Sequence, residues 1–173
     1  MKIKTVKCRM LAGTLEKPIQ FGIGAFPTFS ATLVEISTDD GISGIGECIV
    51  RKAPQVTKTV VEQMLAPALI GRDPHDVEGL WDEMFQQLRG WGHYRGFVFE
   101  AISGIDTALW DILGKAAGAP VYKMLGGAGR SRVPCYASSV YFNDIPKMVE
   151  EARQQIAQGH HAIKVKIGRP PQM

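Results

Sequence analysis

The sequence predicts an α+β fold: a three-stranded antiparallel meander, then helices, then the beginning of an alternating β/α region. Three observations carry this prediction. Alternating and β-branched segments in the first fifty residues are bounded by Gly, Pro and Asp-Gly turns. Apolar residues then recur at helical spacing. After residue 128 the order becomes strand, helix, strand, which is typical of a parallel βαβ unit.

The meander is predicted from three short segments. Residues 2–10 alternate in polarity, and residues 28–38 and 42–49 are rich in side chains that favour strands. The last two segments are joined by Asp39-Asp40-Gly41, a turn because Asp-Gly tolerates positive φ. Residues 13–27 contain several glycines and prolines, so we expect a flexible loop carrying exposed aromatic side chains there.

Three helices are expected next. The first covers residues 54–70 and ends at a glycine. The second begins at Asp73-Pro74, with the aspartate as its cap, and runs to about residue 88. The third and longest covers residues 97–117 and is stopped by Gly118.

The pattern changes near residue 128, which we take as a domain boundary between residues 1–128 and 129–173. Residues 132–139 and 161–167 are predicted as short buried strands, with a helix over residues 144–158 between them. A strand, a crossover helix and a second strand of this length form a parallel pair.

Composition narrows the class of protein. The chain has 173 residues, of which 45% are hydrophobic and 21% charged, an ordinary balance for a globular domain. A net charge of +3 gives no reason to expect a nucleic-acid or membrane partner. Three widely spaced cysteines indicate reduced thiols in a cytoplasmic protein, and no apolar run is long enough for a membrane helix.

Residues 101–127 read AISGIDTALWDILGKAAGAPVYKMLGG and carry the most specific pattern in the chain. An ordinary amphipathic helix explains the apolar stripe. It does not explain Asp106, Asp111 and Lys115 in register with the Pro-Val and Leu-Gly-Gly that follow. This segment resembles the helix signature of the mandelate racemase / muconate lactonizing enzyme family of the enolase superfamily. Met124 stands where leucine is usual in that family.

The resemblance covers nearly the whole chain and implies its architecture. Residues 1–128 would be the enolase-like N-terminal capping domain. Residues 129–173 would be the start of an incomplete (β/α)₈ TIM-type barrel, so that the chain is truncated. The resemblance also implies Mg²⁺ held by three carboxylates on later barrel strands, and no such ligand can be assigned in this chain. We further expect a homo-oligomer.

Lys164-Val165-Lys166 is the sharpest chemical feature. Residues two apart on a strand face the same way, so the two lysines share a face. Two ammonium groups about 7 Å apart repel each other. Repulsion and partial burial both favour the neutral amine that a general base requires. The alternative is a solvent-facing edge strand protected by lysines. The resemblance makes Lys166 the base that removes a proton α to a carboxylate, with Lys164 as its helper.

Further candidates for substrate contact are weaker. Tyr136 and Ser138 share a face of the other barrel strand and could line the pocket, or they could be ordinary polar residues at a strand end. Phe21 and Phe26 lie in the predicted loop, and Arg51 lies in a second one. Both loops resemble the mobile cap loops that set specificity in the family. For Arg51 an ordinary surface position is the simpler interpretation.

Two other patterns do not support a site. Gly41, Gly44 and Gly46 follow a strand, but a strand rather than a helix comes next, which argues against a phosphate or dinucleotide cradle. His160 and His161 are adjacent and would face opposite ways on a strand, so they would not share a metal ion.

The sequence therefore predicts the N-terminal part of a Mg²⁺-dependent enzyme that abstracts the α-proton of a small carboxylate or sugar acid. The type is a racemase or an acid-sugar dehydratase, and the fragment itself is expected to be inactive. Two alternatives stay open. One is a muconate-type cycloisomerase, and the other is a non-enzymatic capping domain that acts as a fold or oligomerisation module.

Overall fold

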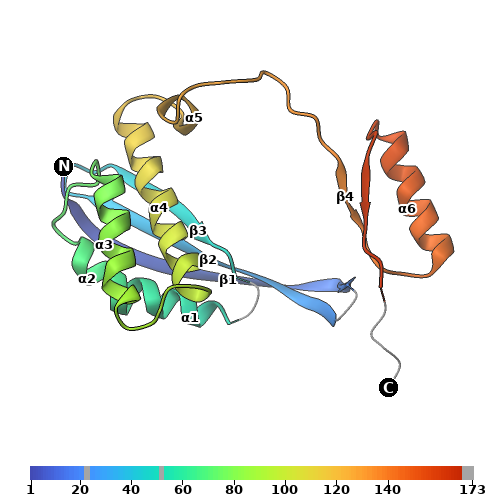
Figure 1. The fold of residues 1–173 in the computed structure, drawn as a ribbon, viewed down its shortest axis with the longest axis horizontal. Coiled ribbons are helices and arrows are strands. Elements are labelled where there is room, and N and C mark those ends of the chain that lie inside the picture. Colours follow the sequence, from blue (N-terminus) through green and yellow to red (C-terminus); the bar gives the residue numbers. More distant parts are fainter. Residues whose placement is uncertain (22–23, 51–52, 169–173) are drawn as a thin grey trace. The chain divides into compact units, whose positions relative to one another are not determined.

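A computed structural model describes residues 1–21, 24–50 and 53–168 (Figure 1). The chain divides into two compact units, one made of residues 1–12 and 30–128 and the other of residues 13–29 and 129–173. Among the described residues, no helix is both long and apolar enough to cross a membrane.

A three-stranded antiparallel sheet opens the fold, in the order β1–β2–β3. Its strands are β1 (Ile3–Phe21), β2 (Gly24–Thr38) and β3 (Ser43–Cys48). The register of β2 and β3 runs from Thr32 opposite Cys48 to Ser37 opposite Ser43. The predicted meander and its Asp-Gly turn are confirmed, and Gly41 adopts a φ of 90° in that turn.

The prediction of a flexible loop over residues 13–27 is wrong. Residues 13–21 continue β1 and residues 24–27 begin β2, so this stretch is the far part of a long hairpin. The prolines that suggested a loop lie where a strand tolerates them. Pro18 is on the edge strand β1, and Pro27 precedes the part of β2 that pairs with β3.

The predicted first helix is present as three consecutive segments. They are α1 (Pro54–Thr59), the π-helical turn η1 (Val60–Leu65) and α2 (Ala66–Leu69). Gly71, with a φ of 80°, follows them as expected.

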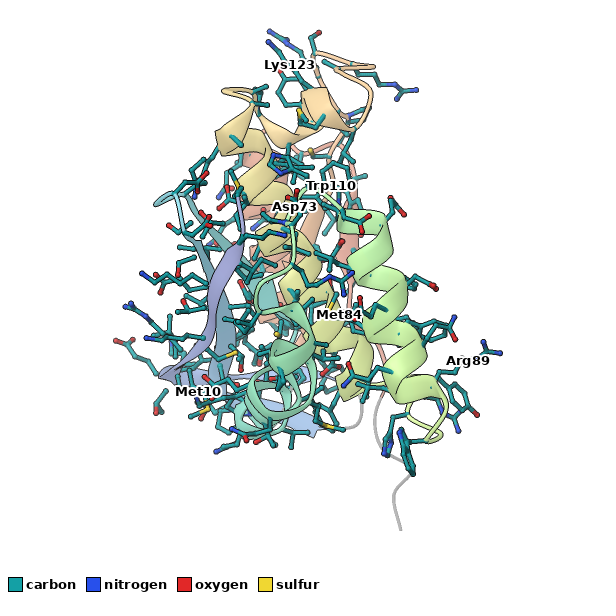
Figure 2. All side chains as sticks on the ribbon, turned by 90° about the vertical axis from the view of Figure 1, so that its left-hand side faces the viewer. Met10, Asp73, Met84, Arg89, Trp110 and Lys123 are labelled. Atoms are coloured by element: carbon teal, nitrogen blue, oxygen red, sulfur yellow. The ribbon has the colours of Figure 1, made fainter. Side chains whose placement is uncertain are left out.

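Two longer helices complete the first unit, α3 (Val77–Arg89) and α4 (Phe97–Ala116). The start predicted for α3 at Asp73 is wrong by several residues. Asp73 instead closes a turn, since its carboxylate accepts the N–H of His75 at 3.0 Å and its carbonyl accepts the N–H of Asp76 at 3.2 Å. Figure 2 shows the exposed Arg89 projecting from the end of α3 while Met84, fully buried, points inward.

Helix α4 lies against β3 more closely than most side chains would allow, and glycines explain how. A Cβ atom added to Gly44 or Gly46 would overlap the carbonyl oxygens of Ala108 and Gly104 on α4. A Cβ on Gly104 would in turn come within 2.5 Å of the Cys48 sulfur. The hydrophobic core between the sheet and α4 includes the fully buried residues Val34, Ile36, Ile105, Leu109 and Ile112.

The second part of the chain contains the predicted strand–helix–strand unit. After the short α5 (Val121–Met124) come β4 (Ala137–Val140), α6 (Ile145–Ala157) and β5 (Ile163–Val165). Strands β4 and β5 are parallel, with a register shift between Ala137 and Val140. Both strands are shorter than predicted, and β5 is largely exposed rather than buried. Their order and parallel pairing are confirmed.

Candidate functional site

The parallel pair β4–β5 has one face on which the β4 side chains are buried, while Val165 of β5 remains exposed there. Ala137 lies opposite Ile163 and Val140 opposite Val165, so these four side chains share a face. Ala137 and Val140 are buried, and α6 lies beside this small sheet in Figure 1. Lys164, between Ile163 and Val165, projects from the opposite face, called the open face below.

Lys164 and Tyr136 meet on that open face. The ammonium nitrogen of Lys164 lies 5.5 Å from the centroid of the Tyr136 ring, within the range of a cation–π interaction. Both side chains are exposed, and Tyr136 retains 53% of its accessible surface. Backbone alternation places Ser138, also exposed, on the same side as Tyr136.

Lys166 follows Lys164 on the same extended segment of the chain. Its N–H donates to the carbonyl of Val140 at 2.9 Å, so the chain is still held against β4 one residue beyond β5. The side chain is half-buried, unlike that of Lys164. Two residues apart on an extended backbone, the two lysines face the same way.

The other predicted substrate-contact residues lie on the strands β1 and β2 or outside the described residues. Phe26 lies on β2, half-buried, with its ring centroid 6.5 Å from that of Phe29. Phe21 ends β1, and its side chain lies outside what the structure describes. Arg51 lies outside the described residues altogether.

The described residues do not provide a metal site. Within residues 1–21, 24–50 and 53–168, no three His, Cys, Asp or Glu side chains come close enough to hold an ion together. The three carboxylates that the family resemblance implies therefore do not fit residues of this part of the chain.

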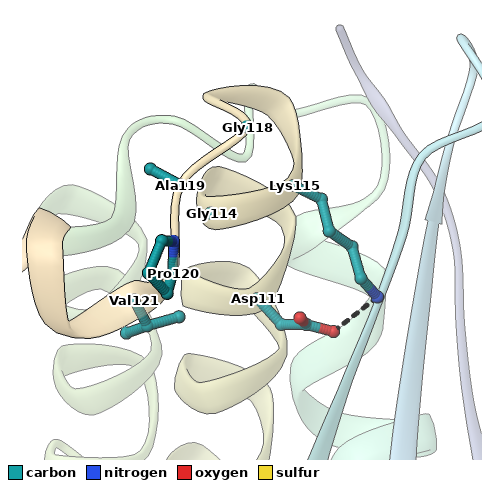
Figure 3. Close-up of a pocket in the computed structure, with 7 residues that line it drawn as sticks. All are labelled: Asp111, Gly114, Lys115, Gly118, Ala119, Pro120 and Val121. Atoms are coloured by element: carbon teal, nitrogen blue, oxygen red, sulfur yellow. Dashed lines mark hydrogen bonds and ion pairs between the residues drawn. The ribbon is translucent and has the colours of Figure 1, made fainter.

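A hollow of about 330 Å³ lies beside the C-terminal end of α4 (Figure 3). Its charged residues are Asp111 and Lys115, which pair at 2.8 Å. Both are already engaged by β3: Lys115 donates to the carbonyl of Ser43 at 2.7 Å, and Asp111 accepts the N–H of Ile45 at 2.9 Å. These two signature residues thus hold the sheet, a role that sequence reasoning missed.

Two buried thiols and one carboxyl are electrostatically unusual. Burial raises the pKa of Cys48 to about 12, and the neighbouring Cys8 adds to the effect. Burial also raises the pKa of Cys8 to about 11, with Glu62 adding to it. Burial raises the pKa of Asp106, and the nearby Glu78 raises it further. All these groups belong to the unit that contains α4, whereas β4 and β5 belong to the other unit.

Comparison with known proteins decides the family. Residues 3–126 match the model of the N-terminal domain of mandelate racemase / muconate lactonizing enzyme. The chain belongs to this family. The match ends before β4, so it covers the sheet and helices α1 to α5 and leaves the lysine-bearing strand outside it.

Individual relatives extend the likeness. A D-galactonate dehydratase family member of Paenibacillus sp. strain JDR-2 is 41% identical over 138 residues, which are 79% of this chain and 33% of the relative. The D-galactarolactone cycloisomerase of Agrobacterium fabrum is 38% identical over 172 residues, 97% of this chain and 44% of that enzyme. A crystal structure of an enolase superfamily member from Polaromonas sp. JS666 superposes with a TM-score of 0.87 at 35% identity, covering 97% of this chain and 45% of that one.

These relatives confirm the enolase-superfamily fold of the chain. The chain spans between a third and a half of the length of each.

Proposed function

We propose that this chain supplies the cap and the first proton-transferring strand of an enzyme that removes the proton α to the carboxylate of a sugar acid. The observation that carries the proposal is the open face of β4–β5, where Lys164 on β5 meets Tyr136, the residue before β4, and Lys166 follows one residue beyond β5. Active sites of (β/α)₈ barrels are built at the carboxyl ends of such strands.

We propose a different role for each of the two lysines. Lys166, half-buried, would accept the α-proton onto its side-chain amine as the general base. Lys164, as an ammonium group, would attract the substrate carboxylate and oppose the negative charge that develops as the proton leaves. The ring of Tyr136 would hold the Lys164 side chain in place from the neighbouring strand.

Sugar acids are the substrate class that the relatives support. Relatives with 36–41% identity are named as a D-galactonate dehydratase family member, an arabinonate dehydratase and a D-mannonate dehydratase. Their alignments cover 78–83% of this chain. We propose Mg²⁺ as the cofactor on family grounds; the described residues offer no ligand set for it. A reducing cytoplasm would suit the three free cysteines.

A cycloisomerase is the second candidate. The relative whose alignment takes in 97% of this chain is D-galactarolactone cycloisomerase, whereas the alignments with the dehydratases cover less. Abstraction of an α-proton by the same lysine would serve either outcome. The later fate of the carbanion would then depend on residues outside this chain.

A chimaera tests the role of Lys166. Residues 1–168 of this chain would replace the aligned part of the Agrobacterium cycloisomerase, with which they share 38% identity. Exchange of substrate α-protons in deuterated water with Mg²⁺ would be followed by proton NMR. The substrates would be D-galactonate, arabinonate, D-mannonate and D-galactarolactone, taken from the names of the relatives.

We expect Lys166→Ala to slow exchange by about 10²–10⁴-fold, the usual contribution of a general base. Lys147→Gln is the matched control, because Lys147 is an exposed lysine on α6 of the same unit. Equal rates for the two variants would show that Lys166 is not the base.

The non-enzymatic alternative is tested on residues 1–173 alone. We propose that this chain by itself exchanges no α-protons from these substrates. A Mg²⁺-dependent rate that is lost in the Lys166→Ala variant would contradict that part of the proposal.

A further inference from the structure

The first edge of the three-stranded sheet is occupied at Cys8 by side chains from the helical layer. The N–H of Cys8 donates to the Glu62 carboxylate at 2.9 Å. The Cys8 carbonyl accepts a hydrogen bond from the Lys58 ammonium group at 3.3 Å. Lys58 and Glu62 are four residues apart on α1 and η1 and pair with each other at 2.6 Å. One acid–lysine pair thus takes both backbone groups of a single edge residue.

The opposite edge is occupied in the same way. On β3, Asp111 accepts the N–H of Ile45 at 2.9 Å, and Lys115 donates to the carbonyl of Ser43 at 2.7 Å. Asp111 and Lys115 are also four residues apart, on α4, and pair at 2.8 Å (Figure 3).

These backbone groups are the ones that an added strand would need. A residue paired antiparallel exchanges both N–H···O bonds with the residue opposite, as Cys8 does with the Glu62–Lys58 pair. The Ser43 carbonyl and the Ile45 N–H flank Gly44, the arrangement that a residue on a parallel strand would bridge. Nearer the start of β1, Ile3 is covered by backbone: its N–H reaches the Arg72 carbonyl at 2.9 Å, and its carbonyl accepts the Gly71 N–H at 2.8 Å.

Stability alone gives little reason for two such pairs. Partly exposed ion pairs contribute little to stability, and the side chains of Lys58, Lys115 and Asp111 keep 33%, 49% and 32% of their accessible surface. An uncovered edge, by contrast, is a template on which another chain can add a strand.

We propose that Lys58–Glu62 and Asp111–Lys115 are edge guards. Each uses one acid and one lysine to occupy outward N–H and C=O groups of an edge strand, so that neither a second copy of this chain nor an extended peptide can pair with the sheet at Cys8 or at Ser43 and Ile45. The guards also place charges where an incoming strand would have to lie, which adds a desolvation penalty to strand addition.

The test removes the guards while keeping side-chain volume. The variants are Lys58→Met with Glu62→Met, Asp111→Leu with Lys115→Met, and the four changes together, all in the full chain. Sedimentation is measured over a concentration series up to about 100 µM, where exposed edges lead to association. We expect the weight-average mass of the fourfold variant to at least double relative to the unchanged chain, with each double variant giving a smaller rise.

Two controls separate guarding from folding. Leu109→Ala removes a fully buried side chain and loses stability with both guards intact, so it should not associate beyond the unchanged chain. Lys58→Met and Lys115→Met alone leave the acid acceptors in place and serve if the double variants do not fold. Hydrogen exchange should show the Cys8 amide protected in the associated Lys58/Glu62 variant.

The proposal is overturned by either of two results. The first is that both the double and the single guard variants sediment like the unchanged chain over the whole concentration range. The second is that Leu109→Ala associates as strongly as the guard variants do.

Discussion

The Lys164 ammonium group lies over the ring of Tyr136, 5.5 Å from its centroid, so a cation on β5 is held by an aromatic residue that precedes β4. The contact joins β5 to the residue that leads into the parallel strand β4. It gives Tyr136 a use that does not depend on its hydroxyl group.

Two substitutions of Tyr136 distinguish a role of its ring from a role of its hydroxyl group. In the chimaera described above, Tyr136→Phe keeps the ring and should exchange α-protons at nearly the unchanged rate. Tyr136→Leu removes a cation–π contact worth about 0.5–1 kcal/mol at an exposed site, so the exchange rate should fall by about 2–5-fold. A loss in Tyr136→Phe as large as in Tyr136→Leu would instead indicate that the hydroxyl group contacts the substrate.

Gly46 tests how closely α4 approaches the sheet. A Cβ at this position would overlap the Gly104 carbonyl oxygen, which belongs to helix backbone and cannot rotate away. We expect Gly46→Ala to lower the free energy of unfolding by about 1–3 kcal/mol or more, measured by urea denaturation. Gly13→Ala is the control, since no atom lies within 4 Å of its added Cβ. Similar losses for both would contradict the close approach.

The cysteines should differ in reactivity. Cys8 and Cys48 are buried, and burial raises their pKa values to about 11 and about 12, so little thiolate forms near neutral pH. Cys135 is exposed. A thiol reagent such as DTNB should therefore label one cysteine quickly in the folded chain and all three after denaturation. Fast labelling of Cys48 without unfolding would show that the contact between β3 and α4 opens readily.

Asp106 should make stability depend on pH in the direction opposite to a paired carboxylate. Burial and Glu78 raise its pKa in the folded chain, so the ionised form is disfavoured there relative to the unfolded chain. Asp106→Asn should therefore raise the melting temperature at about pH 7, and the gain should shrink as the pH falls through the folded pKa and vanish below the unfolded value near pH 3.9.

Asp82→Asn, an exposed aspartate on α3, is the control for that measurement. A decrease in melting temperature for Asp106→Asn at about pH 7 would mean that its carboxylate forms a stabilising interaction when ionised.

Glu62 should give stability a pH dependence opposite in sign to that of Asp106. Burial works against its ionisation, yet the hydrogen bonds from Lys58 and from the Cys8 N–H hold its pKa below the usual value. Its contribution to stability should be present above the unfolded pKa, near 4.3, and should be lost as the pH falls through the folded one. Between about pH 6 and pH 3, Glu62→Gln should show a shallower loss of stability than the unchanged chain.

Periodicity and turn residues predicted most of the fold. The helical spacing over residues 97–117 gave α4, and Asp39-Asp40-Gly41 placed the turn before β3. Such local patterns reflect which face of an element is buried, and they survive tertiary context. The errors came where context overrides local preference. Prolines in residues 13–27 suggested a loop because an edge position, where a strand tolerates them, is not visible in the sequence.

In the candidate site too, some features follow from local sequence patterns and others depend on tertiary contacts. The alternation of Lys164, Val165 and Lys166 predicts that the two lysines share a face, because strand geometry alone decides it. The contact of Lys164 with Tyr136 depends on the register of β4 and β5, which alternation does not reveal. Asp111 and Lys115 stood out in the signature segment, but their partners on β3 are more than sixty residues away along the chain.

Regenerating the amine at position 166 tests the central claim most directly. In the chimaera, Lys166→Cys would be made together with Cys135→Ser and without other exposed cysteines, then treated with bromoethylamine to form an aminoethyl side chain of nearly lysine length. We predict that α-proton exchange is lost in Lys166→Cys and largely returns after this treatment. Exchange that persists without the amine, or that stays absent although mass spectrometry shows full conversion, would contradict the assignment of Lys166 as the base.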